Sequence, residues 1–248
     1  MRSGLISILL LWSFVSFGQG VIFGHAAHPV TPSPLTEYGW ESHYDYENNT
    51  NDDAGNHNLT ATGGATYATD NSPPLNTYAG DLNGSNRSFD IPQFDWGNEW
   101  TFCTRWEVFS GTGTRTIATN MVALDGWKLQ YDFTSERYEF VTGNGSLTDE
   151  AYSNSSLGVG VGDPSICVVC DKSLGSVLFY SNGVNVTSDG VTRTDYETNA
   201  MVQIGLNIDD SGDLYGDVDD TPIYLGKLDS DSILYWHNNV GEEVHYLK

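Results

Sequence analysis

The feature of this sequence that most constrains its fold is the two-residue alternation of EWTFCTRWEVF, residues 99–109. Large, mostly apolar side chains take every second position, and a cysteine and charged side chains take the positions between them. Because successive side chains of an extended strand point to opposite faces, this segment predicts a strand with one face in a core. The core-facing set is Trp100, Phe102, Thr104, Trp106 and Val108, and the opposite set is Cys103, Arg105 and Glu107.

The rest of the chain repeats this pattern in about a dozen short segments, with a turn signal about every ten residues. The pairs Asn83-Gly84 and Asn182-Gly183 each predict a type I′ hairpin turn. LDSDSILYWHNN is the single segment read as a helix, with Ser230 as its candidate N-cap. The sequence therefore predicts an all-β fold, a two-sheet antiparallel β-sandwich. In a further strand, GWKLQYDF, one face holds Trp127, Leu129 and Tyr131.

The N-terminus has the features of an export signal. Arg2 precedes an apolar stretch from Leu5 to Phe17, which is short for a membrane span. Residues 1–18 are predicted to be a signal peptide, with cleavage as late as residue 26 as a second option and an uncleaved anchor as the alternative. A proline-containing linker over 19–37, one domain over 38–236 and a tail over 237–248 follow. No later segment is apolar enough to span a membrane, and seven N-x-S/T triplets fit export.

The charge balance excludes some partners. Lys and Arg total 10 against 33 Asp and Glu, for a formal net charge of -23. Such a chain repels nucleic acid and anionic membranes. The balance favours calcium binding, solubility at high salt, or a neutral partner such as a glycan.

The three cysteines are Cys103, Cys167 and Cys170. Cys167 and Cys170 form a lone CxxC, whose members face opposite sides of a strand, and there is no second CxxC to complete a zinc site. All three are interpreted mainly as small buried apolar residues. A bridge from Cys103 to one of the others stays open as an alternative.

Several weak motifs occur in a recognisable order between Trp40 and Trp236. They are DAGNHNL, GDLNGSNRSFDIP, WTFCTRWEVF, GWKLQYD, ICVVCD, LFYSNGVNV, VQIGL, YGDVDDTPIYL and LDSDSIL. In this order the chain resembles the laminin-G-like, concanavalin A-like lectin/glucanase superfamily. The resemblance implies a concanavalin A-like jelly roll over nearly the whole mature chain.

The acidic run DLYGDVDD, residues 213–220, is the densest group of carboxylates. On a strand, Asp217 and Asp219 share a face with Cα atoms about 6.7 Å apart, near the spacing of a glycosidase pair. The glycosidases that this chain resembles carry three acids on one strand, whereas Tyr215 and Thr221 flank the pair here. No catalytic residue is therefore predicted. We interpret these acids as the outer face of an exposed strand, where they discourage edge pairing.

The turn DDSGD precedes that run. Its oxygen ligands, Asp209, Asp210 and Asp213, are candidates for a calcium site, with a solvated acidic turn as the alternative. Calcium is the one cofactor that the sequence suggests.

These observations predict a secreted, non-catalytic, lectin-like module that recognises a glycan or glycoprotein at the extracellular surface. Aromatic rings would stack on sugars while Asn and Asp bind hydroxyls. Aromatic residues in loop-like contexts are the ligand candidates. The alternative is a structural or adhesive surface protein of a virion or cell envelope that contacts other surface proteins, and a glycoside hydrolase ranks third. The four ligand candidates are Trp96, Tyr138, Tyr152 and Tyr196.

Overall fold

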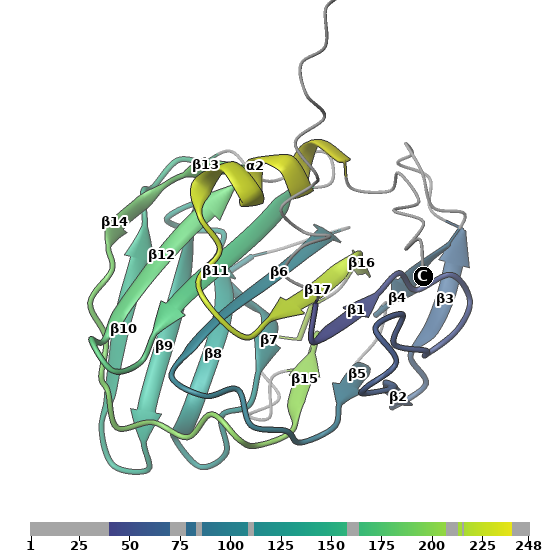
Figure 1. The fold of residues 1–248 in the computed structure, drawn as a ribbon, viewed down its shortest axis with the longest axis horizontal. Coiled ribbons are helices and arrows are strands. Elements are labelled where there is room, and N and C mark those ends of the chain that lie inside the picture. Colours follow the sequence, from purple (N-terminus) through teal and green to yellow (C-terminus); the bar gives the residue numbers. More distant parts are fainter. Residues whose placement is uncertain are drawn as a thin grey trace, which may run out of the picture.

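The computed structural model describes residues 40–69, 78–82, 86–108, 112–157, 164–206, 213–214 and 216–239. Two antiparallel sheets lie face to face and enclose the core (Figure 1). The predicted all-β class and the two-sheet antiparallel sandwich are confirmed. Asn83 and Gly84 lie outside the described residues, but Asn182 and Gly183 have φ angles of 50° and 74°, as a type I′ turn requires.

The first sheet has nine strands. Its main order is β13-β12-β11-β6-β16-β4-β3, with β17 beside β6 and β1 beside β17. The bounds are β1 Ser42–Tyr44, β3 Thr66–Thr69, β4 Tyr78–Asp81, β6 Glu99–Val108, β11 Ser165–Asp171, β12 Ser176–Ser181, β13 Val184–Asn185, β16 Gly216–Asp219 and β17 Thr221–Tyr224.

The second sheet has eight strands in the order β14-β10-β9-β8-β7-β15-β5-β2. Strands β7 to β10 form consecutive hairpins, whereas β15 is inserted between β7 and β5 from far along the chain. The bounds are β2 Thr60–Thr62, β5 Ser88–Ile91, β7 Thr114–Thr119, β8 Asp125–Asp132, β9 Arg137–Asn144, β10 Thr148–Ser153, β14 Thr187–Asp189 and β15 Val202–Ile204.

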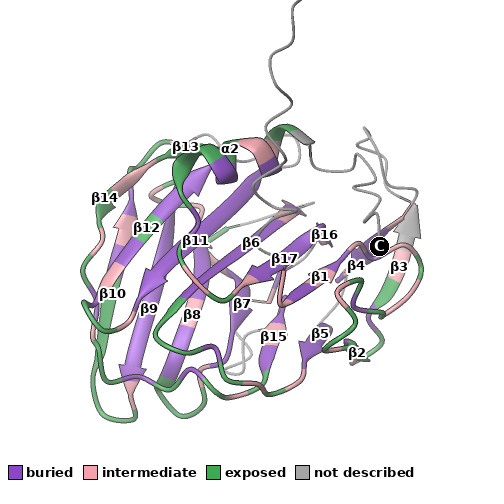
Figure 2. Cartoon of the chain, in the orientation of Figure 1, coloured by how far each residue is buried: buried purple, intermediate pink, exposed green. Residues whose placement is uncertain are grey.

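Aromatic side chains fill the space between the sheets. Most residues of the strands in both sheets are buried, as the purple colouring in Figure 2 shows. Trp100 of β6 and Trp127 of β8 meet with ring centroids 5.0 Å apart, and Trp127 stacks on Phe140 of β9 at 5.6 Å. The alternation is confirmed over residues 100–106, because Trp100, Phe102 and Trp106 lie in this core while Cys103 lies in a separate cluster on the other face of the sheet. The side chains of Val108 and Phe109 lie outside the described part of the chain.

That second cluster is covered by helix α2, Ser230–Asn239. Ile233 and Trp236 of the helix belong to it, so the helix closes part of the outer face of the nine-stranded sheet. The N-cap is Asp229 rather than Ser230, because its carboxylate accepts the N–H of Ser232 at 2.7 Å. This hydrogen bond from Ser232 lowers the pKa of Asp229. Among the described residues, no helix has the length and apolar character needed to cross a membrane.

The cysteines differ from the main prediction. Cys103 of β6 and Cys167 of β11 are directly opposite in register and form a disulfide, with Cα atoms 4.1 Å apart. The alternative of a Cys103 bridge is therefore the one found. Cys170 is a free thiol on the opposite face of β11, inside the main core, where burial raises its pKa well above the usual value.

The acids of the run 213–220 were predicted to form the outer face of one exposed strand, and this is wrong in two respects. β16 is an interior strand between β6 and β4, and Asp219 and Asp220 are each only 5% exposed. Asp220 has a φ of +42° and separates β16 from β17. β6 pairs with both strands, but its register moves by one residue between Asp219↔Arg105 and Ile223↔Phe102. Asp220 is thus the extra residue of a β-bulge.

Candidate functional site

The outer face of the eight-stranded sheet carries a row of polar side chains. Tyr152 of β10 is opposite Glu139 of β9, which is opposite Gln130 of β8. Gln130 donates a hydrogen bond from Nε2 to Glu139 Oε2 at 2.7 Å. Their neighbours in sequence point the other way, into the core, so alternation along each strand fixes the row in place.

Arg137 joins this row from the start of β9. Its Nε and Nη2 donate to Glu139 Oε1 at 3.1 and 3.0 Å, and its guanidinium lies 3.8 Å from the centre of the Tyr152 ring. The Tyr152 hydroxyl donates to Glu150, which raises the pKa of Tyr152 to about 12. The phenol is therefore a neutral donor at physiological pH. We name Gln130, Arg137, Glu139, Glu150 and Tyr152 the polar face.

Polar side chains continue across the same sheet beyond the polar face. At its other end, Asp90 of β5 accepts hydrogen bonds from Ser88 at 2.6 Å, Thr62 at 2.8 Å and Gln203 at 3.3 Å. One row in register crosses seven strands, and six of its seven residues are polar, Val141 being the exception. That row is Glu150, Val141, Lys128, Thr119, Gln203, Asp90 and Thr60.

Of the four predicted ligand-binding aromatics, Tyr152 alone lies partly exposed, on the polar face. Trp96, Tyr138 and Tyr196 are buried, with exposures of 1%, 0% and 2%. Trp96 stacks on Phe94, and Tyr138 points into the core from β9. The expectation that these three rings are available to a ligand is therefore wrong. A binding role for Tyr152 stays a prediction.

Arg137, Glu139 and Gln130 were not among the predicted site residues. The sequence does contain a signal for them, because GWKLQYDF and RYEFVTG alternate aromatic with polar positions. No role was predicted for these polar positions. Only the β8–β9 register, in which Gln130 meets Glu139, shows that they form one connected group.

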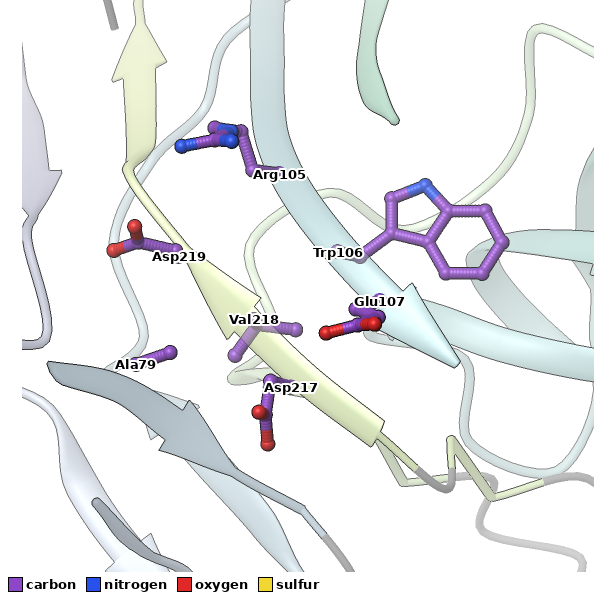
Figure 3. A pocket seen from close by; sticks show the side chains of 7 residues that line it. All are labelled: Ala79, Arg105, Trp106, Glu107, Asp217, Val218 and Asp219. Atoms are coloured by element: carbon purple, nitrogen blue, oxygen red, sulfur yellow. The ribbon is translucent and has the colours of Figure 1, made fainter. Parts of the chain in front are cut away.

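A second polar surface lies on the outer face of the nine-stranded sheet, in a shallow depression that is partly open to solvent (Figure 3). Asp217 and Asp219 of β16 are opposite Glu107 and Arg105 of β6. The two aspartates share a face, as their spacing predicted. Of the two residues that flank the aspartate pair in sequence, Thr221 is buried, and its hydroxyl is hydrogen-bonded to that of Thr104 at 2.8 Å. Tyr215 lies outside the described residues.

The predicted calcium ligands are described only in part. Asp209 and Asp210 lie outside the described residues, and the Asp213 carboxylate accepts the Asn86 N–H at 3.0 Å. Within the described ranges, no three His, Cys, Asp or Glu side chains are grouped as a metal site requires. Calcium at this turn stays a prediction.

A partly buried ionic cluster fixes strand β1. His43 lies between Asp220, at 2.5 Å from Nε2, and Asp53, at 3.5 Å from Nδ1. Burial alone would lower the pKa of His43, but Asp220, then Asp53 and Asp45, raise it overall. Burial and the nearby Asp45 raise the pKa of Asp53 to about 6. The folded state therefore holds protons at this cluster more tightly than the unfolded chain does.

This cluster predicts that the domain is less stable at pH 8 than at pH 5.5. The stability from His43 is present below its ordinary pKa of 6.5 and is lost as pH rises through its raised value, and the cost of ionising Asp53 appears between 3.8 and about 6. We expect the unfolding temperature to fall by about 3 °C or more over this range, measured by scanning calorimetry.

His237, whose pKa is lowered by burial, changes the stability in the opposite direction over the same pH range. Comparing Asp53→Asn with the wild type at each pH removes this contribution, because both proteins contain His237. Asp53→Asn should raise the unfolding temperature at pH 8 and leave it nearly unchanged below pH 4. An equal effect of the substitution at both pH values would contradict the prediction.

Comparison with known proteins places this arrangement among β-sandwiches. No family model and no curated sequence matches the chain. One similar solved structure is of botulinum neurotoxin type C, whose cell entry depends on interaction with two ganglioside molecules. It is 15% identical to this chain, with a TM-score of 0.65. The binding domain of neurotoxin DC, in complex with rat synaptotagmin II, is 14% identical at 0.64. The two matches cover 84% and 83% of this chain. This chain spans about half the length of the two matched chains, 52% in each case.

A third similar structure is matched over nearly its whole length. It is domain 4 of AbnA, a GH43 extracellular arabinanase from Geobacillus stearothermophilus, in complex with arabinotriose. It is 18% identical with a TM-score of 0.63, and the match covers 80% of this chain and 98% of that domain. At these identities the likeness establishes the β-sandwich fold, and the laminin-G-like assignment stays a prediction.

Proposed function

We propose that this protein is a secreted, non-catalytic carbohydrate-binding module that takes a neutral glycan on its polar face. The observation that carries the proposal is the connected group of Tyr152, Arg137, Glu139 and Gln130 on an outer sheet surface. Its side chains are held by one another before any ligand arrives. Binding then costs little side-chain entropy.

The chemistry of the polar face suits sugar hydroxyls. Each hydroxyl both donates and accepts, and the polar face offers carboxylate acceptors next to amide, guanidinium and phenol donors. Glu139 and Gln130 are each only 8% exposed, so a ligand that reaches them forms hydrogen bonds partly shielded from water. The partly exposed ring of Tyr152 adds an apolar surface of the kind that sugar rings contact.

The negative charge on this side of the sheet favours neutral glycans over acidic ones as ligands. Glu139, Glu150 and Asp132 bring carboxylates to this side of the sheet, and Arg137 is already bound by Glu139. The hydrogen bonds of Asp132, first from Ser135, lower its pKa and keep it ionised. A glycan that carries sialic or uronic acid would meet this charge and a net charge of -23.

Two further observations support the proposal. The similar AbnA domain is matched over 98% of its length, and its structure was solved with a bound arabinose oligosaccharide. The Cys103–Cys167 disulfide supports export, because disulfides persist mainly in oxidising compartments.

The proposal is tested by screening the purified domain on an array of neutral and acidic glycans, followed by calorimetry with the best neutral oligosaccharide. Tyr152→Ala and Glu139→Ala are each expected to weaken binding about tenfold or more, because each removes a contact or a charged hydrogen bond. Asp217→Asn, on the opposite sheet, is the matched control and should bind normally. The screen is run with calcium and with a chelator, which tests the predicted ion.

The site is wrongly placed if Asp217→Asn loses binding while Tyr152→Ala and Glu139→Ala retain it. If the wild-type domain binds no glycan on the array, the proposed function itself fails.

A further inference from the structure

The turn between β7 and β8 has an unusual backbone for its sequence. Val122 and Asp125 exchange both backbone hydrogen bonds, at 2.8 and 2.9 Å, which leaves a two-residue loop of Ala123 and Leu124. Their φ angles are +49° and +67°, the left-handed region at both positions. This geometry is a type I′ turn, which strongly favours Asn-Gly. Ala-Leu is a strained choice here, and Leu has a large side chain that must then project outward.

The neighbouring β9–β10 turn holds this strained loop in place. Gly145 donates its N–H to the carbonyl oxygen of Leu124 at 2.9 Å. The approach is so close that a Cβ on Gly143 would lie 2.1 Å from the same oxygen. The two turns therefore form one supported unit at the end of the eight-stranded sheet, at the lower edge of Figure 1.

Large apolar side chains point into solvent from this unit. Val122 is 57% exposed, Leu124 is 47% exposed and Leu147, in the neighbouring turn, is 62% exposed. We name these three side chains the apolar tip. Strained backbone that presents exposed apolar groups without adding to the core is typical of a binding surface.

Acidic residues surround the apolar tip. Asp125 closes the strained turn, and its carboxylate accepts the N–H of Glu197 at 3.2 Å. Asp195 accepts a hydrogen bond from Asn144 of the neighbouring turn at 2.9 Å and is paired with Arg193 at 2.8 Å, so Asp125 and Glu197 carry the charge that faces a partner. All three acids are exposed. A second copy of this chain or an anionic membrane would bring like charge against them.

We propose that the apolar tip docks into an apolar pocket on a protein partner whose rim carries Lys or Arg. Leu124, Val122 and Leu147 enter the pocket, and the exposed carboxylates of Asp125 and Glu197 pair with the basic rim. This site is separate from the polar face and does not depend on glycan binding.

The test uses a phage library of random dodecapeptides selected on the full-length protein. Selected peptides should combine Leu, Phe or Trp with Lys or Arg. Their binding should fall at least tenfold for the double variant Ala123→Asn with Leu124→Gly, and also for Val122→Ser with Leu147→Ser. The first double variant should unfold about 5 °C higher than the wild type, since it relieves the backbone strain. Val184→Ser, at an exposed valine at the start of β13 on a different hairpin, is the control.

Four outcomes would overturn the proposal. The first is equal selection of peptides on the Asn-Gly variant, and the second is a set of selected sequences that lack basic residues. Binding of the wild type to phosphatidylcholine vesicles, or tip-dependent self-association in sedimentation, would assign the apolar tip to a lipid or to a second copy. A stabilised Asn-Gly variant that has lost the peptides excludes misfolding as the cause.

Discussion

Replacing Cys103 and Cys167 together by alanine is expected to lower the free energy of unfolding by about 4 kcal/mol. The disulfide links residues 64 positions apart, so its loss frees a long loop in the unfolded chain. The bridge also lies in the cluster beneath α2 with Ile233 and Trp236, where two alanines leave space. A loss of this size is a large part of the stability of an ordinary domain.

Denaturant unfolding of the oxidised protein, the reduced protein and the double variant measures this effect. Cys170→Ala is the matched control, because it removes a buried thiol without opening a bridge and should cost only about 1 kcal/mol. If reduction and the double substitution both leave the unfolding midpoint unchanged, the bridge does not stabilise the fold.

Asp52→Ala is expected to be comparably destabilising, at about 4 kcal/mol. The Asp52 carboxylate is 5% exposed and accepts four backbone N–H groups. Alanine would leave these four backbone donors without their carboxylate acceptor. They belong to His43 at 2.8 Å, Ala54 at 2.9 Å, Asn56 at 3.0 Å and His57 at 2.7 Å.

The same denaturant titration separates this effect from a general cost of changing the loop. Asp52→Asn keeps one acceptor oxygen and should lose about half as much stability, and the exposed Asn51→Ala should lose little. Hydrogen exchange should show faster exchange at residues 43–58 in Asp52→Ala. Equal losses in Asp52→Ala and Asn51→Ala would contradict the structural role assigned to the carboxylate.

The sequence predicted the layers well because the strand period is local. The alternation around Trp100 and Trp127 identified the core faces of β6 and β8, and Asn182-Gly183 identified a hairpin turn. Pairing between distant strands could not be obtained in this way. Cys103 meets Cys167 only because β6 lies beside β11, which nothing within either segment indicates.

The candidate site was less predictable for a related reason. Trp96 is in a loop, yet it packs between other rings in the core, so a loop position did not mean exposure. Glu139 and Gln130 looked like ordinary polar positions until the hairpin register joined them. Of the predicted aromatics, Tyr152 alone is partly exposed, but it lies on strand β10 and not in a loop. Its contact with Arg137 is one that the sequence does not display.

Asp220, the extra residue of the β-bulge, also has a structural role of its own. Val218 and Ile223 both point into the core although an odd number of steps separates them, and this is feasible only because one residue between them lies outside the ladder. Shortening the chain by that residue would keep both apolar side chains inward. It would, however, remove the carboxylate that holds His43, so β1 would lose its ionic anchor while the sandwich itself stayed assembled.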